Sequence, residues 1–140
     1  MFTTGENNNR GLPHNMPTIT FEIDPNVEGY ATDYSSLVFA PNATASNKWS
    51  DYIDATDDSA GLWGLSAGAF SSHKCHLNNA RCTWSELKEL LDDGGDEPVI
   101  GSLQIAKGRD RAWQGAVDGL RYNDTIFDFE EHGVVERAAD

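Results

Sequence analysis

Residues 74–91, K-C-H-L-N-N-A-R-C-T-W-S-E-L-K-E-L-L, join two local signals that decide the fold. Cys75 and Cys82 are the only two cysteines of the chain, and their spacing suits a small loop closed by a disulfide. Residues 83–86, T-W-S-E, then match a capping box, whose first and last side chains satisfy free amide donors of a new helix. We therefore expect a short helix over about residues 84–91, directly after a disulfide loop.

Metal binding is the chemical alternative to this disulfide. His73, Cys75, His76 and Cys82 lie close together in the sequence, and imidazoles and thiolates are zinc ligands. The spacing lacks the paired two-residue spacers of zinc modules, so the disulfide is favoured, and free thiols are a third alternative.

Segments of strand length surround this loop and helix. Residues 18–24 alternate strictly and put Ile19, Phe21 and Ile23 on one face. Further strands are expected within residues 34–40, 48–55, 61–66, 98–106, 113–122 and 126–129, separated by Gly, Asn and Asp turns. The pattern predicts a mainly β fold, namely an antiparallel, jelly-roll-like β-sandwich with one short helix.

The two ends differ in composition from the middle of the chain. Residues 1–16 are rich in Asn and Gly and predict a flexible N-terminal arm, whereas residues 130–140 predict a flexible acidic tail. Residues 17–129 would form the β-sandwich domain. Seven or so strands are few for a closed jelly roll of eight, so we expect an open sheet edge that a partner strand completes.

The charge of the chain limits its partners. Twenty-three acidic and ten basic residues give a net charge of −13, which argues against nucleic acid and anionic membranes as partners. Adaptation to high salt and a Ca²⁺-loaded surface both account for such a charge. The scarcity of lysine favours a halophilic origin over the alternative of an ordinary acidic mesophilic protein. No apolar run approaches the ~18 residues that cross a bilayer, so membrane insertion is not expected.

Five segments, read in order, resemble a known class of module. They are Y-S-S-L-V-F-A-P (34–41), K-W with I-D-A (48–55), G-L-W (61–63), the cysteine segment with T-W-S-E-L (75–87), and W-Q-G-A-V-D-G-L (113–120). Over residues 17–129 the chain resembles the concanavalin-like, laminin-G-like β-sandwich modules of secreted actinobacterial and haloarchaeal surface proteins. The resemblance implies a sandwich in which the cysteine pair bridges a loop beside a short helix. The chain departs from these modules in having fewer strands before residue 17.

Acidic residues supply candidate metal ligands. Asp54, Asp57 and Asp58 lie where one expected strand turns into the next, and Asp118 lies within a later strand. Oxygen-rich turns are where sandwich modules hold structural Ca²⁺, so these four aspartates are candidate Ca²⁺ ligands. The alternative is a set of solvated turns in an acidic protein.

Aromatic residues and asparagines supply two further kinds of candidate site. Trp63 and Tyr52 are the candidate platforms for stacking on sugar rings, although aromatic side chains more often belong to the core. Asn42 and Asn123 each begin an Asn-X-Thr acceptor pattern for glycosylation, which matters only in exported chains.

No arrangement of catalytic residues is recognisable. Residues 64–68 match G-x-S-x-G, but that motif needs a strand-to-helix elbow in a parallel α/β fold, which is not predicted here. We expect a non-enzymatic module at the cell surface, outside the cell or in a virion, acting as a structural subunit of a surface layer, filament or virion. Its partners would be further copies or other surface subunits. Carbohydrate binding or adhesion, with or without Ca²⁺, is the alternative.

Overall fold

The computed structural model describes residues 2–4, 16–42, 48–72, 74–108 and 115–139. Its strands and helices, in chain order, are β1 (Phe2–Thr4), β2 (Thr18–Asp24), β3 (Ser35–Pro41), β4 (Gly61–Leu65), the 3-10 helix η2 (Gly68–Phe70), α1 (Trp84–Leu91), β5 (Val99–Ala106), β6 (Gly115–Val117), β7 (Leu120–Tyr122), β8 (Thr125–Glu130) and β9 (Gly133–Ala138).

The largest sheet is antiparallel and has the strand order β4-β3-β2-β5. One of its two inner strands, β2, has the bounds and the alternation that the sequence predicts. Ile23 is buried, while Ile19 and Phe21 are half-buried against the same core. The pairing of β2 with β5 is irregular between Glu22 and Ile23, where the register shifts.

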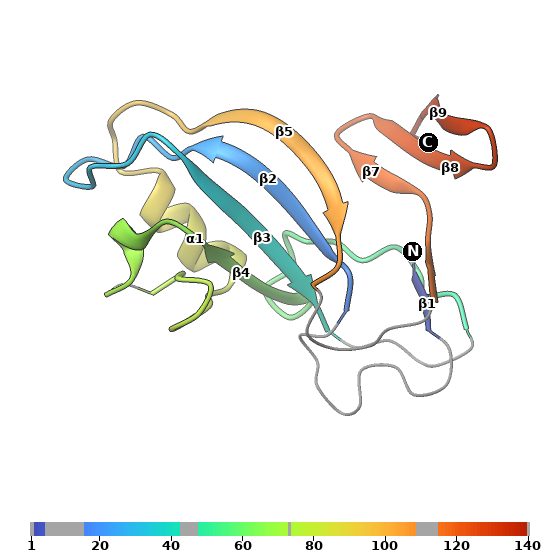
Figure 1. Ribbon diagram of the computed structural model, residues 1–140, viewed down its shortest axis with the longest axis horizontal. Coiled ribbons are helices and arrows are strands. Elements are labelled where there is room, and N and C mark those ends of the chain that lie inside the picture. The colour runs from blue at the N-terminus through green and yellow to red at the C-terminus, as the bar shows by residue number, and fades with distance from the viewer. Residues whose placement is uncertain (1, 5–15, 43–47, 73, 109–114, 140) are drawn as a thin grey trace.

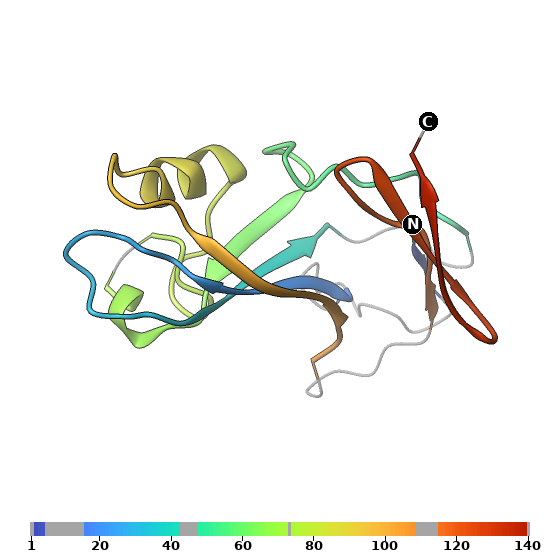
Figure 2. The same ribbon diagram turned by 90° about the horizontal axis from the view of Figure 1, so that it is seen from above.

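The main core lies between this sheet and the segment that carries the disulfide and the helix. Phe39, Trp63 and Leu65 reach it from the sheet, Phe70 from η2 and Leu87 from α1, and all five are buried. Figure 2 shows α1 on one face of the four-stranded sheet. Burying one stripe of a short helix in this way supplies stability that eight isolated residues would lack.

The second sheet is antiparallel and has the order β7-β8-β9. It lies beyond one end of the four-stranded sheet in both views (Figures 1 and 2). The rings of Phe21 on β2 and Tyr122 on β7 meet at a centroid distance of 6.2 Å. The strands β1 and β6 form a separate two-stranded antiparallel sheet. Antiparallel sheets with one short helix after a disulfide loop agree with the predicted β-sandwich.

Two expected strands take another form. Residues 48–55 contain no strand where the structure describes them, because the side chains of Asp54 and Asp57 accept hydrogen bonds that hold turns instead. The strand expected up to Tyr122 is divided into β6 and β7, with Gly119 between them at φ +65°. Residues 109–114, with Trp113, lie outside the described residues.

The ends of the chain contain strands that were not predicted. Residues 133–138, expected to be part of a flexible tail, form β9, in which Val134 pairs with Phe129 and Arg137 forms an ion pair with Asp128 at 2.6 Å. In the expected arm, residues 2–4 form β1 and Met16 is buried, while residues 5–15 lie outside the described residues. Charge and Asn content therefore concealed short strands that need a partner strand to form.

Candidate functional site

The disulfide loop covers one edge of the four-stranded sheet. Cys75 and Cys82 form the predicted disulfide, with a Cα–Cα distance of 4.7 Å and both residues buried. The loop pairs with β4, since Trp63 exchanges backbone hydrogen bonds with Cys82 at 2.7 and 2.9 Å and Leu77 donates to the Leu65 carbonyl. The thiols are therefore joined to each other and are not zinc ligands.

Of the two histidines in the zinc alternative, the structure describes only His76. His76 is buried, and its Nδ1 accepts a hydrogen bond from the backbone of Asn78 at 3.4 Å. His73 lies outside the described residues.

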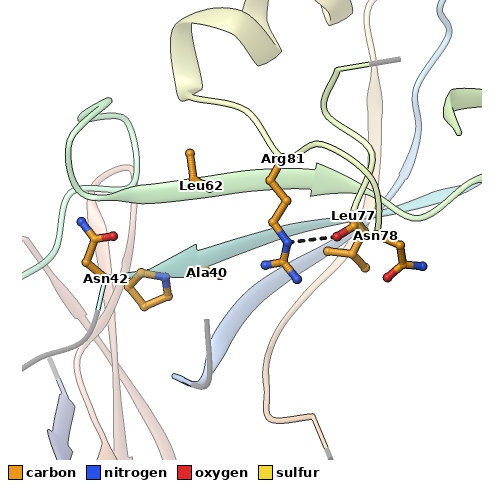
Figure 3. Close-up of a pocket in the computed structure, with 7 residues that line it drawn as sticks. Ala40, Asn42, Leu62, Leu77, Asn78 and Arg81 are labelled. Carbon is orange, nitrogen blue, oxygen red and sulfur yellow. Dashed lines mark hydrogen bonds between the residues drawn. The ribbon is translucent and has the colours of Figure 1, made fainter. Parts of the chain in front are cut away.

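A pocket of about 340 Å³ opens between this loop and the ends of two strands. It is lined by Ala40, Pro41, Asn42, Leu62, Leu77, Asn78 and Arg81 (Figure 3). Three of these residues lie between the two cysteines in the sequence, so the disulfide helps to fix one wall. The opposite wall comes from β3 and β4, which pair with each other.

Arg81 supplies the charge of this pocket. Its Nε donates a hydrogen bond to the Leu77 carbonyl at 3.0 Å, which orients the guanidinium group (Figure 3). Its Nη1 is buried and has no hydrogen-bond partner, and the described residues place no carboxylate in an ion pair with it. Burial lowers the pKa of the Arg81 guanidinium from its ordinary value, although an arginine stays charged in a protein. A buried donor without a partner costs about 1–3 kcal/mol of folding stability.

The sequence alone does not reveal this pocket. The signal that the sequence offered was an arginine between the two cysteines, in a chain with few basic residues. Nothing in the sequence says that the side chain turns inward, because this depends on how the loop lies against β4.

The candidate Ca²⁺ ligands serve as hydrogen-bond acceptors for their own chain. Asp54 accepts from the backbone and hydroxyl of Thr56 at 2.9 and 2.7 Å, and Asp57 accepts from Ser59 at 2.8 and 2.7 Å. These hydrogen bonds lower the pKa of both carboxyls. The two side chains therefore hold tight turns.

Asp58 and Asp118 are used in the same way at longer range. Asp58 accepts from the backbone of Ser85 in the first turn of α1 at 2.9 Å. Asp118 accepts from Gly119 at 2.7 Å and from Phe129 at 2.9 Å, which ties β7 to β8. Over the described ranges, no three His, Cys, Asp or Glu residues are grouped so that they would hold a metal ion. The predicted Ca²⁺ set is therefore not brought together.

The two candidate sugar platforms have different surroundings. Trp63 is 3% exposed and packs against Phe39 and Trp84 with ring centroids 5.1 and 5.3 Å apart, so it belongs to the core and offers no platform. Its Nε1 donates to the Ala55 carbonyl. Tyr52 is 46% exposed.

The two glycosylation candidates are both exposed. Asn42 lies just after β3, lines the pocket, and donates a hydrogen bond from Nδ2 to the Ser59 carbonyl at 2.7 Å. Asn123 lies in the turn between β7 and β8 with φ +52°. Residue 44, the threonine of the first acceptor pattern, lies outside the described residues.

The edge strand β5 presents a second candidate surface. It pairs with β2 on one side only, and its eight residues include no charged side chain, although charged residues make up 24% of the chain. Val99 and Ile100 on it are 58% and 49% exposed. Proteins commonly protect such an edge with charges or a cover, and β5 shows neither among the described residues.

The chain matches none of the protein families, curated proteins or solved structures with which it was compared. Among the residues that the structure describes, no helix is both long enough and apolar enough to span a membrane.

Proposed function

We propose that this protein is a non-enzymatic assembly module that joins copies of itself through the outer edge of β5. The supporting observation is the absence of charge along this edge strand of an acidic protein. An extracellular, cell-surface or virion setting fits this proposal, since subunits of layers, filaments and capsids repeat one contact many times.

The edges formed by β4 and β9 are less suited to pairing. The outer side of β4 is covered by the disulfide loop. The outer strand β9 carries Glu136 and Arg137, and charged side chains on an edge oppose the approach of another strand.

A second copy is the partner that fits β5 most simply. Two antiparallel β5 strands related by a two-fold axis would form identical contacts in both directions and would join the two four-stranded sheets into one. Each copy carries a net charge of −13, so we expect this dimer to form at molar salt, where repulsion is screened.

Light scattering after size exclusion tests the contact at molar KCl without reductant. We expect a dimer for the full chain and a monomer for Ser102→Lys/Gln104→Lys, because lysine side chains on an edge strand oppose the addition of another strand. Glu22, which Gln104 contacts at 3.4 Å, can pair with a lysine there and preserve the monomer fold.

The control variant is Ala69→Lys/Ser72→Lys, which adds the same charge at exposed positions away from β5. It should remain dimeric. A full chain that is monomeric at every concentration, or a Ser102→Lys/Gln104→Lys variant that stays dimeric, would contradict the proposal.

Carbohydrate binding is a second candidate, favoured by the exposure of two aromatic side chains in one segment. Trp49 is 47% exposed and Tyr52 is 46% exposed. Glycan-array binding that Trp49→Ala or Tyr52→Ala removes would support this function, and no binding of the full chain would count against it.

A further inference from the structure

We propose that the Arg81 pocket binds a small organic carboxylate. The pocket is lined by residues of β3, β4 and the disulfide loop, whereas β5 is at the opposite edge of the four-stranded sheet. The binding site is therefore independent of the assembly proposed above.

The guanidinium group is held in place before a ligand arrives. Arg81 immediately precedes the bonded Cys82, and its Nε is fixed by the Leu77 carbonyl at 3.0 Å. This leaves the two Nη groups, of which Nη1 is buried and unpaired. The end of a guanidinium is suited to a carboxylate, because two parallel N–H groups match its two oxygens.

No described group of the chain supplies the missing acceptor. Among the described residues, ion pairs join Lys74 to Glu86 and Arg137 to Asp128, and neither involves Arg81. This is unexpected in a chain with 23 acidic and only 10 basic residues, where an arginine has many carboxylates to choose from. An acceptor from outside the chain would satisfy Nη1.

The rest of the lining defines the body of the ligand. Pro41, Leu62 and Leu77 offer apolar contact, and the exposed amides of Asn42 and Asn78 offer hydrogen bonds to hydroxyl or carbonyl groups. A volume of about 340 Å³ is at the small end of ligand pockets. The fitting class is a carboxylate of about the size of a uronic acid or an amino acid.

Nuclear magnetic resonance titration of the oxidised full chain tests this site, with the Arg81 Nε–H signal as the readout. The ligands are glucuronate, acetate, neutral glucose and inorganic phosphate, each at constant KCl. We expect saturable shifts of that signal with glucuronate and weaker shifts with acetate, but none with glucose. Saturation by glucose would overturn the carboxylate requirement, and tighter binding of phosphate than of either carboxylate would point to a different anion.

Two arginine variants locate the site. Arg81→Gln should weaken glucuronate binding at least tenfold, while Arg121→Gln, an exposed arginine on β7 whose Nε donates to the Asn123 carbonyl, should leave binding unchanged. Equal binding by both variants would overturn the proposal. Should Arg81→Gln fail to fold, Arg81→Lys keeps the charge but loses the paired donors, and the shift of the Arg81 signal in the unaltered chain still decides the question.

Assembly and binding can fail separately in these experiments. The variant Ser102→Lys/Gln104→Lys should bind glucuronate as the unaltered chain does, because its substitutions lie on β5. Loss of binding in this variant, with the fold retained, would contradict the placement of the site.

Discussion

Asp118 shows how a single carboxylate can hold a small sheet together. Its Oδ1 accepts from Gly119, which directly precedes β7, and from Phe129, which lies on β8. The three-stranded sheet has only one buried side chain, Ile126, among its described residues. A hydrogen-bonded carboxylate therefore carries a larger share of the stability here than it would beside a full core.

We expect Asp118→Ala to lower the free energy of unfolding by about 1–3 kcal/mol, because it leaves two backbone donors without their acceptor. Asp118→Asn keeps an acceptor oxygen and should cost less. Urea unfolding at molar KCl measures both variants, and equal stability of Asp118→Ala and the unaltered chain would show that the hydrogen bonds contribute nothing.

Acid should destabilise the fold through its turn aspartates. Hydrogen bonds from Thr56 lower the pKa of Asp54, and hydrogen bonds from Glu28 and Gly95 lower that of Asp93. A carboxyl whose pKa is lower in the folded state than in the unfolded state stabilises the fold. This contribution is fully present at a pH above the pKa in the unfolded state, about 3.9, and is lost as the pH falls through the pKa in the folded state. We therefore expect the urea concentration at the unfolding midpoint, measured at molar KCl, to decrease as the pH is lowered below 4.

Aspartate-to-asparagine variants separate this effect from general charge. Asp54→Asn should reduce the fall in the urea midpoint, whereas Asp51→Asn should not, because Asp51 is exposed and has no hydrogen bond or ion pair that the structure describes. A midpoint that stays constant from pH 7 to pH 3 would contradict the role of these carboxylates.

Residue roles could be predicted from the sequence only where the partner is close along the chain. The capping side chains of Thr83 and Glu86 lie three residues apart, and the sequence identifies both. The burial of Trp63 depends on Phe39 and Trp84, which are more than 20 residues away. Arg81 likewise depends on how its loop meets β4, so neither role is visible in a local pattern.

At the scale of elements, the helix and its loop form one unit. The capping box of α1 is complete, since Thr83 accepts from the Glu86 backbone and the Glu86 side chain accepts from Thr83. Lys74, next to Cys75, also pairs with Glu86, and this interaction is the main cause of the lowered pKa of that carboxyl. The disulfide and the helix start therefore stabilise each other.

Thr83→Ala should lower the free energy of unfolding by about 1 kcal/mol, as the loss of an N-cap does in other helices. Thr83→Ser keeps the hydroxyl acceptor and serves as the control. Thermal unfolding compares the two, and an alanine variant as stable as the serine variant would show that the cap is dispensable.

Reduction of the disulfide should destabilise the fold and open the pocket. Closing a loop of this length contributes roughly 2.5 kcal/mol through the entropy of the unfolded chain. Cys75→Ser/Cys82→Ser should show this loss in urea, together with weaker glucuronate binding, because Leu77, Asn78 and Arg81 lie in the loop. Unchanged binding would show that the pairing of the loop with β4 suffices to hold Arg81.

Elements could be predicted where alternation or caps mark them. The sequence predicts β2 and α1 with the bounds that the structure shows. It does not predict β9, in which Val134 and Val135 lie between charged residues. It also predicts a strand in residues 48–55, where the Asp54 carboxylate holds a turn instead. Strand formation depends on a partner, which a single segment does not reveal.

For the whole molecule, repulsion among its charges is the dominant long-range interaction. The net charge of −13 is carried by 140 residues, and among the described residues ion pairs join Lys74 to Glu86 and Arg137 to Asp128. We expect the melting temperature to fall when KCl is lowered from molar to ~0.1 M, because the screening length increases from about 3 to 10 Å. A melting temperature that does not depend on KCl would contradict a halophilic origin.

Asn42 links the surface chemistry of the molecule to its pocket. The same side chain that lines the pocket begins an Asn-X-Thr acceptor pattern. An attached oligosaccharide would branch from Nδ2 at the rim, where the amide now contacts the Ser59 carbonyl, and would occupy the entrance. Protein made in a glycosylating host and protein made in bacteria should therefore differ in access to Arg81, so that the choice of expression host decides which form of the site is observed.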